Sequence, residues 1–134
     1  MIPENDDIAW TITDPQKRKV VLKRSTLDKH IAGADHDPRD SEFRKKIMHQ
    51  AQQTIVDPEF IIKANSRNIY LSLVNVPYQD NFDKLKTLKV VVDSDRHPNE
   101  VVTWLPLKKF NSTIESEAII YARKSNVIVS DSLV

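Results

Sequence analysis

The strongest strand signal in the sequence is Leu88-Lys89-Val90-Val91-Val92, at the centre of a segment from Leu85 to Asp93. It is rich in β-branched residues, which pack well on the pleated surface of a sheet. A turn at residues 94–99 leads into a second extended segment, Glu100-Val101-Val102-Thr103-Trp104-Leu105. Because consecutive strands with so short a connection pair as antiparallel neighbours, these segments predict a hairpin within a sheet.

Other extended segments lie on both sides of this hairpin. Alternating or continuous apolar residues predict strands, and the turn residues Asp14-Pro15 join the first two of them. The segment from Ser112 to Lys124 fits two structures. Ser112 and Glu115 would cap a helix, whereas Ala118 to Ala122 suits an edge strand, which we favour. The predicted strands before the hairpin are Ile8–Thr13, Arg18–Leu22, Phe60–Ile62 and Asn68–Val76.

A short helix is predicted after the second strand. Ser25 is its expected N-cap, because a hydroxyl there can accept from a free backbone N–H of the first turn. Leu27, Ile31 and Ala34 recur at helical spacing and share one face. Gly33 is the only glycine in the chain, and it stands where this helix should end.

A second, longer helix is predicted from Asp40 to Thr54, because apolar residues recur on one face of it. Asp57-Pro58 follows and breaks the pattern. His49 projects away from the apolar stripe and is interpreted as a surface residue. The stripe consists of Phe43, Ile47, Met48, Ala51 and Ile55.

Together these elements predict the α+β class. The helices must bury their apolar stripes, and a sheet face is the partner available to them. We expect N-terminal short strands and two helices packed on one face of a mainly antiparallel sheet of about four or five strands. A single domain is expected over residues 1–134, with a folded core at 8–124 and loose ends at 1–7 and 126–134.

The composition of the 134-residue chain excludes several classes of protein. With 40% hydrophobic and 29% charged residues, the chain is neither disordered nor membrane-embedded. The absence of cysteine excludes disulfide scaffolds, thiolate zinc sites and cysteine nucleophiles. No apolar run approaches the roughly 20 residues that a membrane span needs. Met1 to Asp7 shows no signal-peptide pattern.

Charge and motif searches narrow the chemistry further. The net charge of +1 favours no class of partner, and two basic stretches are interpreted as solvated faces. One glycine excludes glycine-rich phosphate loops, and no H-E-x-x-H or G-x-S-x-G string occurs. His30 and His36, together with Asp35 or Asp37, are an alternative set of ligands for a divalent ion. We favour a site without metal or cofactor. The second basic stretch consists of Arg39, Arg44, Lys45 and Lys46.

Three strings of sequence resemble a known family. The first is Leu27-Asp28-Lys29-His30-Ile31 with His36 a few residues on, and the second is Val56-Asp57-Pro58-Glu59-Phe60-Ile61. The third is Val90-Val91-Val92 followed by Val101-Val102-Thr103-Trp104. With the order of elements, they resemble the barnase–EndoU–colicin–RelE group of ribonucleases, in its branch from phages and mobile elements.

The resemblance implies a toxin-type, metal-independent endoribonuclease. RNA can be cut without a metal because its 2′-hydroxyl can attack the adjacent phosphate, given a general base, a general acid and donors around the phosphate. Histidine suits both proton roles. His30, at a helix edge, is the predicted base or acid, and His36 in the following loop is its counterpart. Thr103, late in a strand, is predicted to position the phosphate.

Three further residues are predicted to bind the RNA. Lys29 and Arg67 are candidate phosphate ligands, and arginine suits this role because its planar fork can bind two oxygens. Tyr70 would stack on a base or meet phosphate. For each predicted site residue an ordinary role remains the alternative: a solvated cation, a core or rim tyrosine, a strand threonine, or a hydrogen-bonded histidine.

RNA and a cognate antitoxin or immunity protein are the expected partners, because a free ribonuclease of this kind poisons its host. The expected place of action is the cytoplasm, with secretion as part of a larger toxin as the open alternative. The rival function is a non-catalytic RNA- or protein-binding module of the same fold, such as a phage accessory or immunity-type protein. Expression distinguishes them, because a toxin is hard to clone without its partner.

Overall fold

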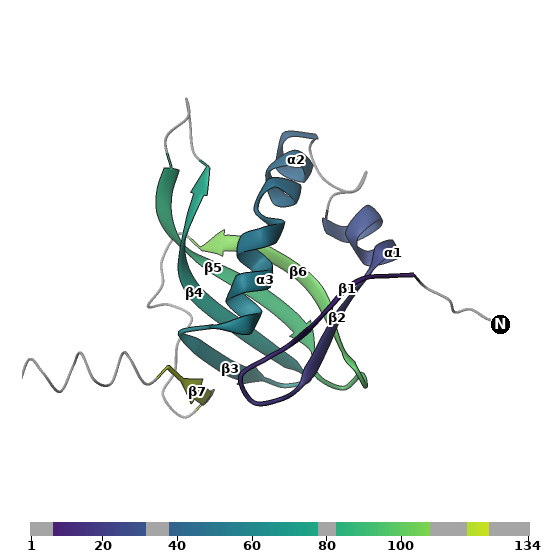
Figure 1. The fold of residues 1–134 in the computed structure, drawn as a ribbon, viewed down its shortest axis with the longest axis vertical. Coiled ribbons are helices and arrows are strands. Elements are labelled where there is room, and N and C mark those ends of the chain that lie inside the picture. The colour runs from purple at the N-terminus through teal and green to yellow at the C-terminus, as the bar shows by residue number, and fades with distance from the viewer. Residues whose placement is uncertain (1–6, 32–37, 78–82, 108–117, 124–134) are drawn as a thin grey trace, which may run out of the picture.

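A computed structural model of the chain describes residues 7–31, 38–77, 83–107 and 118–123. Helices lie in front of a strongly twisted sheet (Figure 1). In chain order the elements are β1 (Ile8–Thr13), β2 (Lys19–Lys23), α1 (Arg24–Thr26), the π-helical η1 (Leu27–Ile31), α2 (Pro38–Lys46), α3 (Met48–Val56), β3 (Phe60–Ala64), β4 (Arg67–Pro77), β5 (Asp83–Asp93), β6 (Asn99–Leu107) and β7 (Ile119–Ala122).

All of these strands join one 7-stranded sheet in the order β1-β2-β6-β5-β4-β3-β7. The pairs are antiparallel except β2 with β6, which run parallel where Val20 and Val21 face Asn99 and Glu100. The α+β class is confirmed, but the predicted number of strands was too low. The first hairpin joins through that parallel pair, and β7 joins through β3. Both pairings connect segments far apart in the chain, so local patterns do not reveal them.

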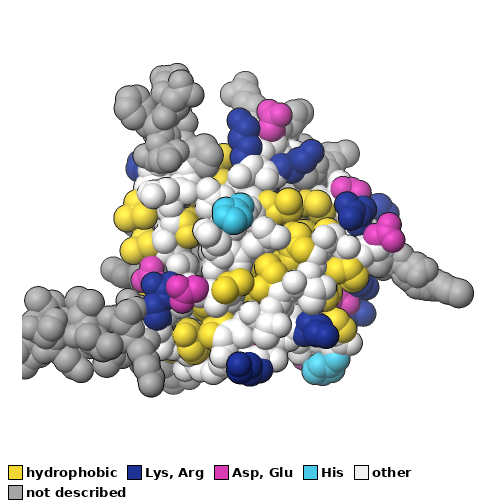
Figure 2. Space-filling view, in the orientation of Figure 1, with side chains coloured by type: hydrophobic (Ala, Val, Ile, Leu, Met, Phe, Trp, Pro, Cys, Tyr) yellow, Lys and Arg dark blue, Asp and Glu magenta, His cyan; other side chains and the backbone are white. Residues whose placement is uncertain are grey.

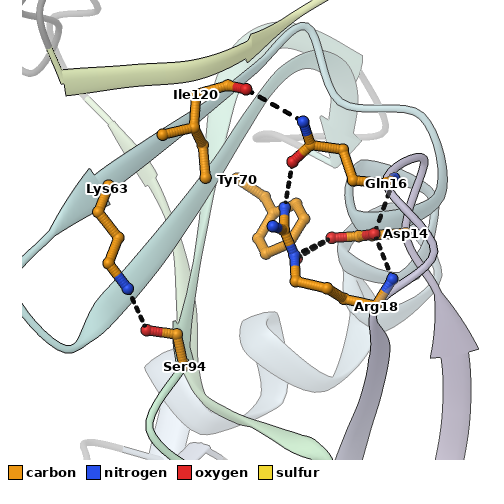
Figure 3. A network of polar contacts seen from close by, with 7 residues as sticks. All are labelled: Asp14, Gln16, Arg18, Lys63, Tyr70, Ser94 and Ile120. Carbon is orange, nitrogen blue, oxygen red and sulfur yellow. Dashed lines mark hydrogen bonds and ion pairs between the residues drawn. The ribbon is translucent and has the colours of Figure 1, made fainter.

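The sheet curls so that its two edges approach each other. Gln16, in the β1–β2 turn, donates from Nε2 to the backbone oxygen of Ile120 in β7 at 3.1 Å (Figure 3). Beside it, the Asp14 carboxylate accepts from the backbone N–H groups of Gln16 and Arg18 at 2.9 Å each. The same carboxylate accepts from the Tyr70 hydroxyl of β4 at 2.6 Å. These contacts attach the first hairpin to strands near the opposite edge.

The predicted second helix is divided in two. Ile47, with φ −98° and ψ 15°, lies between α2 and α3, so the expectation of one continuous helix was wrong. The backbone N–H of Ile47 still donates to Phe43 at 3.1 Å, and its oxygen accepts from Ala51 at 3.0 Å. The chain therefore changes direction at a fully buried residue and keeps these hydrogen bonds. The apolar stripe is confirmed, since Ile47, Ala51 and Ile55 are buried, and His49 is exposed as predicted.

The first helix begins earlier than predicted. Strand β2 runs directly into α1, Lys23 is the N-cap, and no side chain caps the helix, so the assignment of Ser25 as N-cap was wrong. The next five residues form the π-helical segment η1. The predicted apolar face is confirmed for Ile31, which is fully buried, and for Leu27, which packs partly buried against the core. Gly33 and Ala34 lie outside the described residues.

The core lies between the helices and one face of the sheet. Helix α3 contacts β1, β4 and β5, which agrees with the predicted placing of helices on one face (Figure 1). Trp104 and Tyr70 are the largest fully buried side chains, and Trp104 stacks on Trp10 with ring centroids 6.4 Å apart. Strand β7 confirms the strand favoured for the end of Ser112–Lys124. Within the described ranges, every helix is too short or too polar to cross a membrane.

Candidate functional site

Strand β6 carries a β-bulge immediately before Thr103. Val91 of β5 faces Thr103 and Val92 faces Val101, so Val102 is an extra residue on β6. Val101 and Trp104 both enter the core although they are three positions apart, a spacing that simple alternation along a strand would not allow. The bulge thus redirects the side chains that follow it and leaves Thr103 half-buried at the margin of the core.

Thr103 is held by Arg44 of helix α2. Nη1 of Arg44 donates to the Thr103 hydroxyl oxygen at 2.8 Å. The indole Nε1 of the next residue, Trp104, donates to the backbone oxygen of Arg44 at 2.9 Å. Two adjacent residues of β6 therefore hold the side chain and the main chain of one arginine. The result is a half-buried guanidinium beside a hydroxyl, and both groups are typical phosphate ligands.

The π-helical segment η1 packs against the two elements that carry this pair. Among the described residues, β2 pairs with β6 only at Asn99 and Glu100. The segment η1 contacts both β6 and α2. His30 belongs to η1. It therefore stands on an element that touches the strand of Thr103 and the helix of Arg44. His36 lies outside the described residues.

Exposed lysines lie on η1 and α2. Lys29 is exposed on η1, as are Lys45 and Lys46 at the end of α2. Lys and Arg side chains gather over α2 at the upper rim of the molecule in Figure 2. At the start of β6, Lys23 forms an ion pair with Glu100 at 3.3 Å. The exposed lysines of η1 and α2 can therefore meet an anionic ligand, although the exposed acids Asp28 and Glu42 lie on the same two elements.

Arg67 is not brought to this site. It is the first residue of β4 and faces Asp93 of β5, one strand removed from β6. From Thr103, its backbone lies two strand spacings of about 4.8 Å across the sheet and two positions of about 3.3 Å along it. Arg67 is half-buried. Its predicted contact with phosphate would therefore take place at another part of the substrate.

Tyr70 lies in the protein core. It is fully buried, and its hydroxyl donates to Asp14 at 2.6 Å. Burial, and then the hydrogen bond to the Asp14 carboxylate, raise the pKa of Tyr70 far above its usual range, because both disfavour the phenolate. A fully buried ring cannot stack on an RNA base, so the site that we propose does not include Tyr70.

Arg44 was missed by the sequence analysis, which placed it in a solvated basic stretch. The signal was present in the helical periodicity. At about 100° per residue, Arg44 projects about 100° from Phe43 and falls within the apolar stripe. A cation inside an apolar stripe needs a polar partner when the stripe is buried. What the sequence could not supply was that partner, since Thr103 lies 59 positions away.

The described residues also bear on metal chemistry. Among them, no group of three or more His, Asp or Glu side chains is close enough to hold a metal ion. The region around Thr103 instead offers a guanidinium, a hydroxyl and exposed lysines. The residues present in this part of the chain suit an anion better than a cation.

Comparison with known proteins identifies the family of the chain. No curated protein matches the chain, and no solved structure matches it. One family model does match, over residues 2–133, and its description is phage-Barnase-EndoU-ColicinE5/D-RelE like nuclease 2. The match covers nearly the whole sequence and agrees with the resemblance in its three strings. The chain therefore belongs to the PBECR2 family, a nuclease-like branch of the barnase–EndoU–colicin–RelE group.

Proposed function

We propose that the protein is a metal-independent endoribonuclease of the toxin type. The observation that carries the proposal is the 2.8 Å hydrogen bond from Arg44 to Thr103 at the bulge of β6, on the strand against which the element of His30 packs. Membership of a nuclease-like family supports the reaction class. RNA is the proposed substrate because its own 2′-hydroxyl supplies the nucleophile, so the site needs proton transfer and charge stabilisation alone.

The proposed reaction is a transesterification within the RNA strand. A general base removes the proton of the 2′-hydroxyl, and the 2′-oxygen attacks the adjacent phosphorus. The bond from phosphorus to the 5′-oxygen breaks, and a general acid gives that oxygen a proton. The products are a 2′,3′-cyclic phosphate and a 5′-hydroxyl. His30 is proposed for one proton transfer and His36 for the other, because imidazole gains and loses protons near neutral pH.

Arg44, Thr103 and Lys29 are proposed to bind the reacting phosphate. Negative charge builds on the phosphate oxygens as the 2′-oxygen attacks, and preorganised donors stabilise that charge most when they are fixed before the reaction. Arg44 is fixed through its backbone oxygen by Trp104 and through its side chain by Thr103. Its planar guanidinium matches two phosphate oxygens, and Lys29 would contribute a second cation from the exposed side of η1.

The first experiment measures cleavage of mixed RNA substrates in excess EDTA. Wild-type protein should cleave, and His30→Ala should lose about a hundredfold or more of the rate, the scale of one acid–base group. His49→Ala is the matched control, because His49 is exposed on α3 and should leave the rate unchanged. Cleavage that depends on a divalent ion, or that survives in His30→Ala, would contradict the proposed mechanism.

A pure wild-type protein that cleaves none of the substrates would favour the rival function, a non-catalytic RNA- or protein-binding module of the same fold. We further propose that an active enzyme has a cognate antitoxin or immunity protein and acts in the cytoplasm. Expression in bacteria tests this pairing. Wild type should be recovered poorly without a partner, while His30→Ala should express freely. Equal and high yields of both would argue against a toxin.

A further inference from the structure

A pocket lies at the end of the curled sheet that carries the β5–β6 turn. Its volume is ≈630 Å³, within the range of about 300–1,000 Å³ of small-molecule sites. Asn99, the first residue of β6, belongs to its lining. Thr103 lies about three ladder positions, or about 10 Å, further along the same strand and does not line it. The pocket is therefore separate from the candidate active site.

The rim of this pocket is cationic. Lys19, Lys63 and His97 line it and are exposed, and none of its described lining residues is Asp or Glu. Arg18 also lines it but is paired with Asp14 at 2.9 Å, so it adds little net charge. Lys19 and Lys63 form no ion pair with a described residue. Two exposed lysines that form no ion pair with a described residue favour an anionic ligand.

The close-up view shows how these groups are arranged. Lys63 and Ser94 lie on one side in Figure 3, and Arg18 and Gln16 lie on the other, with Ile120 between them at the top. Nζ of Lys63 donates to Oγ of Ser94 at 2.7 Å. Serine hydroxyls and lysine ammonium groups are both common phosphate ligands. Lys63 and Ser94 therefore suit a phosphate that lies between them.

A buried amide gives a second and independent indication of a ligand. Asn68 of β4 lines the pocket, is 2% exposed, and its Oδ1 has no hydrogen-bond partner among the described residues. Buried polar groups without a partner are rare in folded proteins, because each forfeits the hydrogen bond it made with water. A ligand group that bonds to this carboxamide would remove that cost.

The pocket also has an apolar part. It is lined by Ile120, which is 38% exposed, and by Pro98, which is also exposed. We infer that the pocket binds a nucleotide, with the phosphate at Lys19 and Lys63 and the base against Ile120 and Pro98, within reach of Asn68. An inorganic anion would use the lysines and leave the apolar part and the amide unused. A free mononucleotide and one nucleotide of an RNA strand share this chemistry.

Binding is measured by NMR on the full chain, with three probes. They are adenosine monophosphate, inorganic phosphate and a short 2′-O-methylated RNA, which lacks the nucleophile for cleavage. Adenosine monophosphate or the RNA should shift the backbone amides of the β5–β6 turn and the side-chain amide of Asn68. Inorganic phosphate should bind at least about tenfold more weakly, because it makes fewer contacts. Binding of the RNA without the mononucleotide would identify a strand as the source of the nucleotide.

Variants separate this pocket from the active site. The double variant Lys19→Ala/Lys63→Ala should weaken binding about tenfold or more, the scale of lost hydrogen bonds to a charged group. Lys86→Ala, on a distant part of β5 opposite Val74, is the matched lysine control and should bind as wild type does. In Arg44→Ala, adenosine monophosphate should still shift the same amides, because Arg44 does not line this pocket. Failure of the nuclease proposal and failure of this inference are therefore distinguishable. The inference is overturned if neither nucleotide probe shifts these amides, if the double variant binds as tightly as wild type, or if inorganic phosphate binds as tightly as the nucleotide.

Discussion

The indole of Trp104 donates a hydrogen bond to the backbone oxygen of Arg44 at 2.9 Å, while the ring of the same Trp104 stacks on Trp10. One fully buried residue therefore joins the core to the arginine of the candidate site. The two tryptophans differ in one respect. Nε1 of Trp10 is buried and has no hydrogen-bond partner in the described part of the chain, whereas Nε1 of Trp104 has one.

This difference predicts unequal effects of the same substitution. Trp104→Phe leaves the Arg44 oxygen without its donor and should cost about 1–3 kcal/mol beyond the lost ring volume. Trp10→Phe removes a donor that was already unpaired and should cost less. Urea unfolding of the two variants measures the difference. Trp104→Phe should also reduce RNA cleavage more than Trp10→Phe does. Equal stability and activity of the two would show that the bond to Arg44 contributes little.

Substitutions at Thr103 test whether its hydroxyl positions Arg44. Thr103→Val keeps the branched shape and removes the hydroxyl, so cleavage should fall about ten- to a hundredfold as the guanidinium loses its position. Thr103→Ser keeps the hydroxyl and should retain most of the activity. Circular dichroism spectra of both variants should match wild type. If Thr103→Val cleaves as fast as Thr103→Ser, the hydroxyl has no part in the reaction.

The bond from Tyr70 to Asp14 should stabilise the closure of the sheet. Tyr70→Phe removes one of the donors to the Asp14 carboxylate and should lower the free energy of unfolding by about 1–2 kcal/mol. The remaining donors, two backbone N–H groups and Arg18, keep the carboxylate satisfied. Tyr121→Phe is a suitable control, since Tyr121 is only half-buried. A Tyr70→Phe protein as stable as wild type would contradict this role.

The same bond predicts a loss of stability in alkali. The pKa of Tyr70 is raised in the folded protein, whereas in the unfolded chain it is about 10. The stabilisation is therefore complete below about pH 10 and is lost as pH rises above that value, because only the unfolded state then releases the proton. Unfolding experiments between neutral pH and pH 11 should show this decline, and it should be smaller in Tyr70→Phe. An equal decline in both proteins would assign the effect to other groups.

Much of the fold could be predicted because its signals are local. The strand at Leu85 to Asp93, its partner after the turn, and the stripe of Phe43, Ile47 and Ala51 all follow from side-chain periodicity. These patterns fix which face of an element is buried, since the period of a helix or a strand does not depend on the rest of the chain. The change from helix to strand at Asp57-Pro58 was also predictable, because proline ends a helix whatever the rest of the chain does.

Pairings between distant segments could not be predicted in this way. The parallel pairing of β2 with β6, the break at Ile47 and the bulge at Val102 depend on how elements pack against one another. Thr103 was predicted as a site residue from a resemblance, and Arg44 was not predicted, because an arginine finds its partner through space. Tyr70 was predicted to bind RNA, with a core or rim position as the alternative, and the structure places it in the core, bonded to Asp14.

The sequence by itself determined the α+β class, the apolar face of each helix, and membership of a nuclease-like family whose model spans residues 2–133. Only the tertiary structure decided that Arg44 of α2 meets Thr103 of β6 and that Lys19, Lys63 and Asn68 share one pocket. The physical reason is that periodicity records how a residue faces its own element, whereas a site is a meeting of several elements, and that meeting is fixed by packing and pairing across the whole chain.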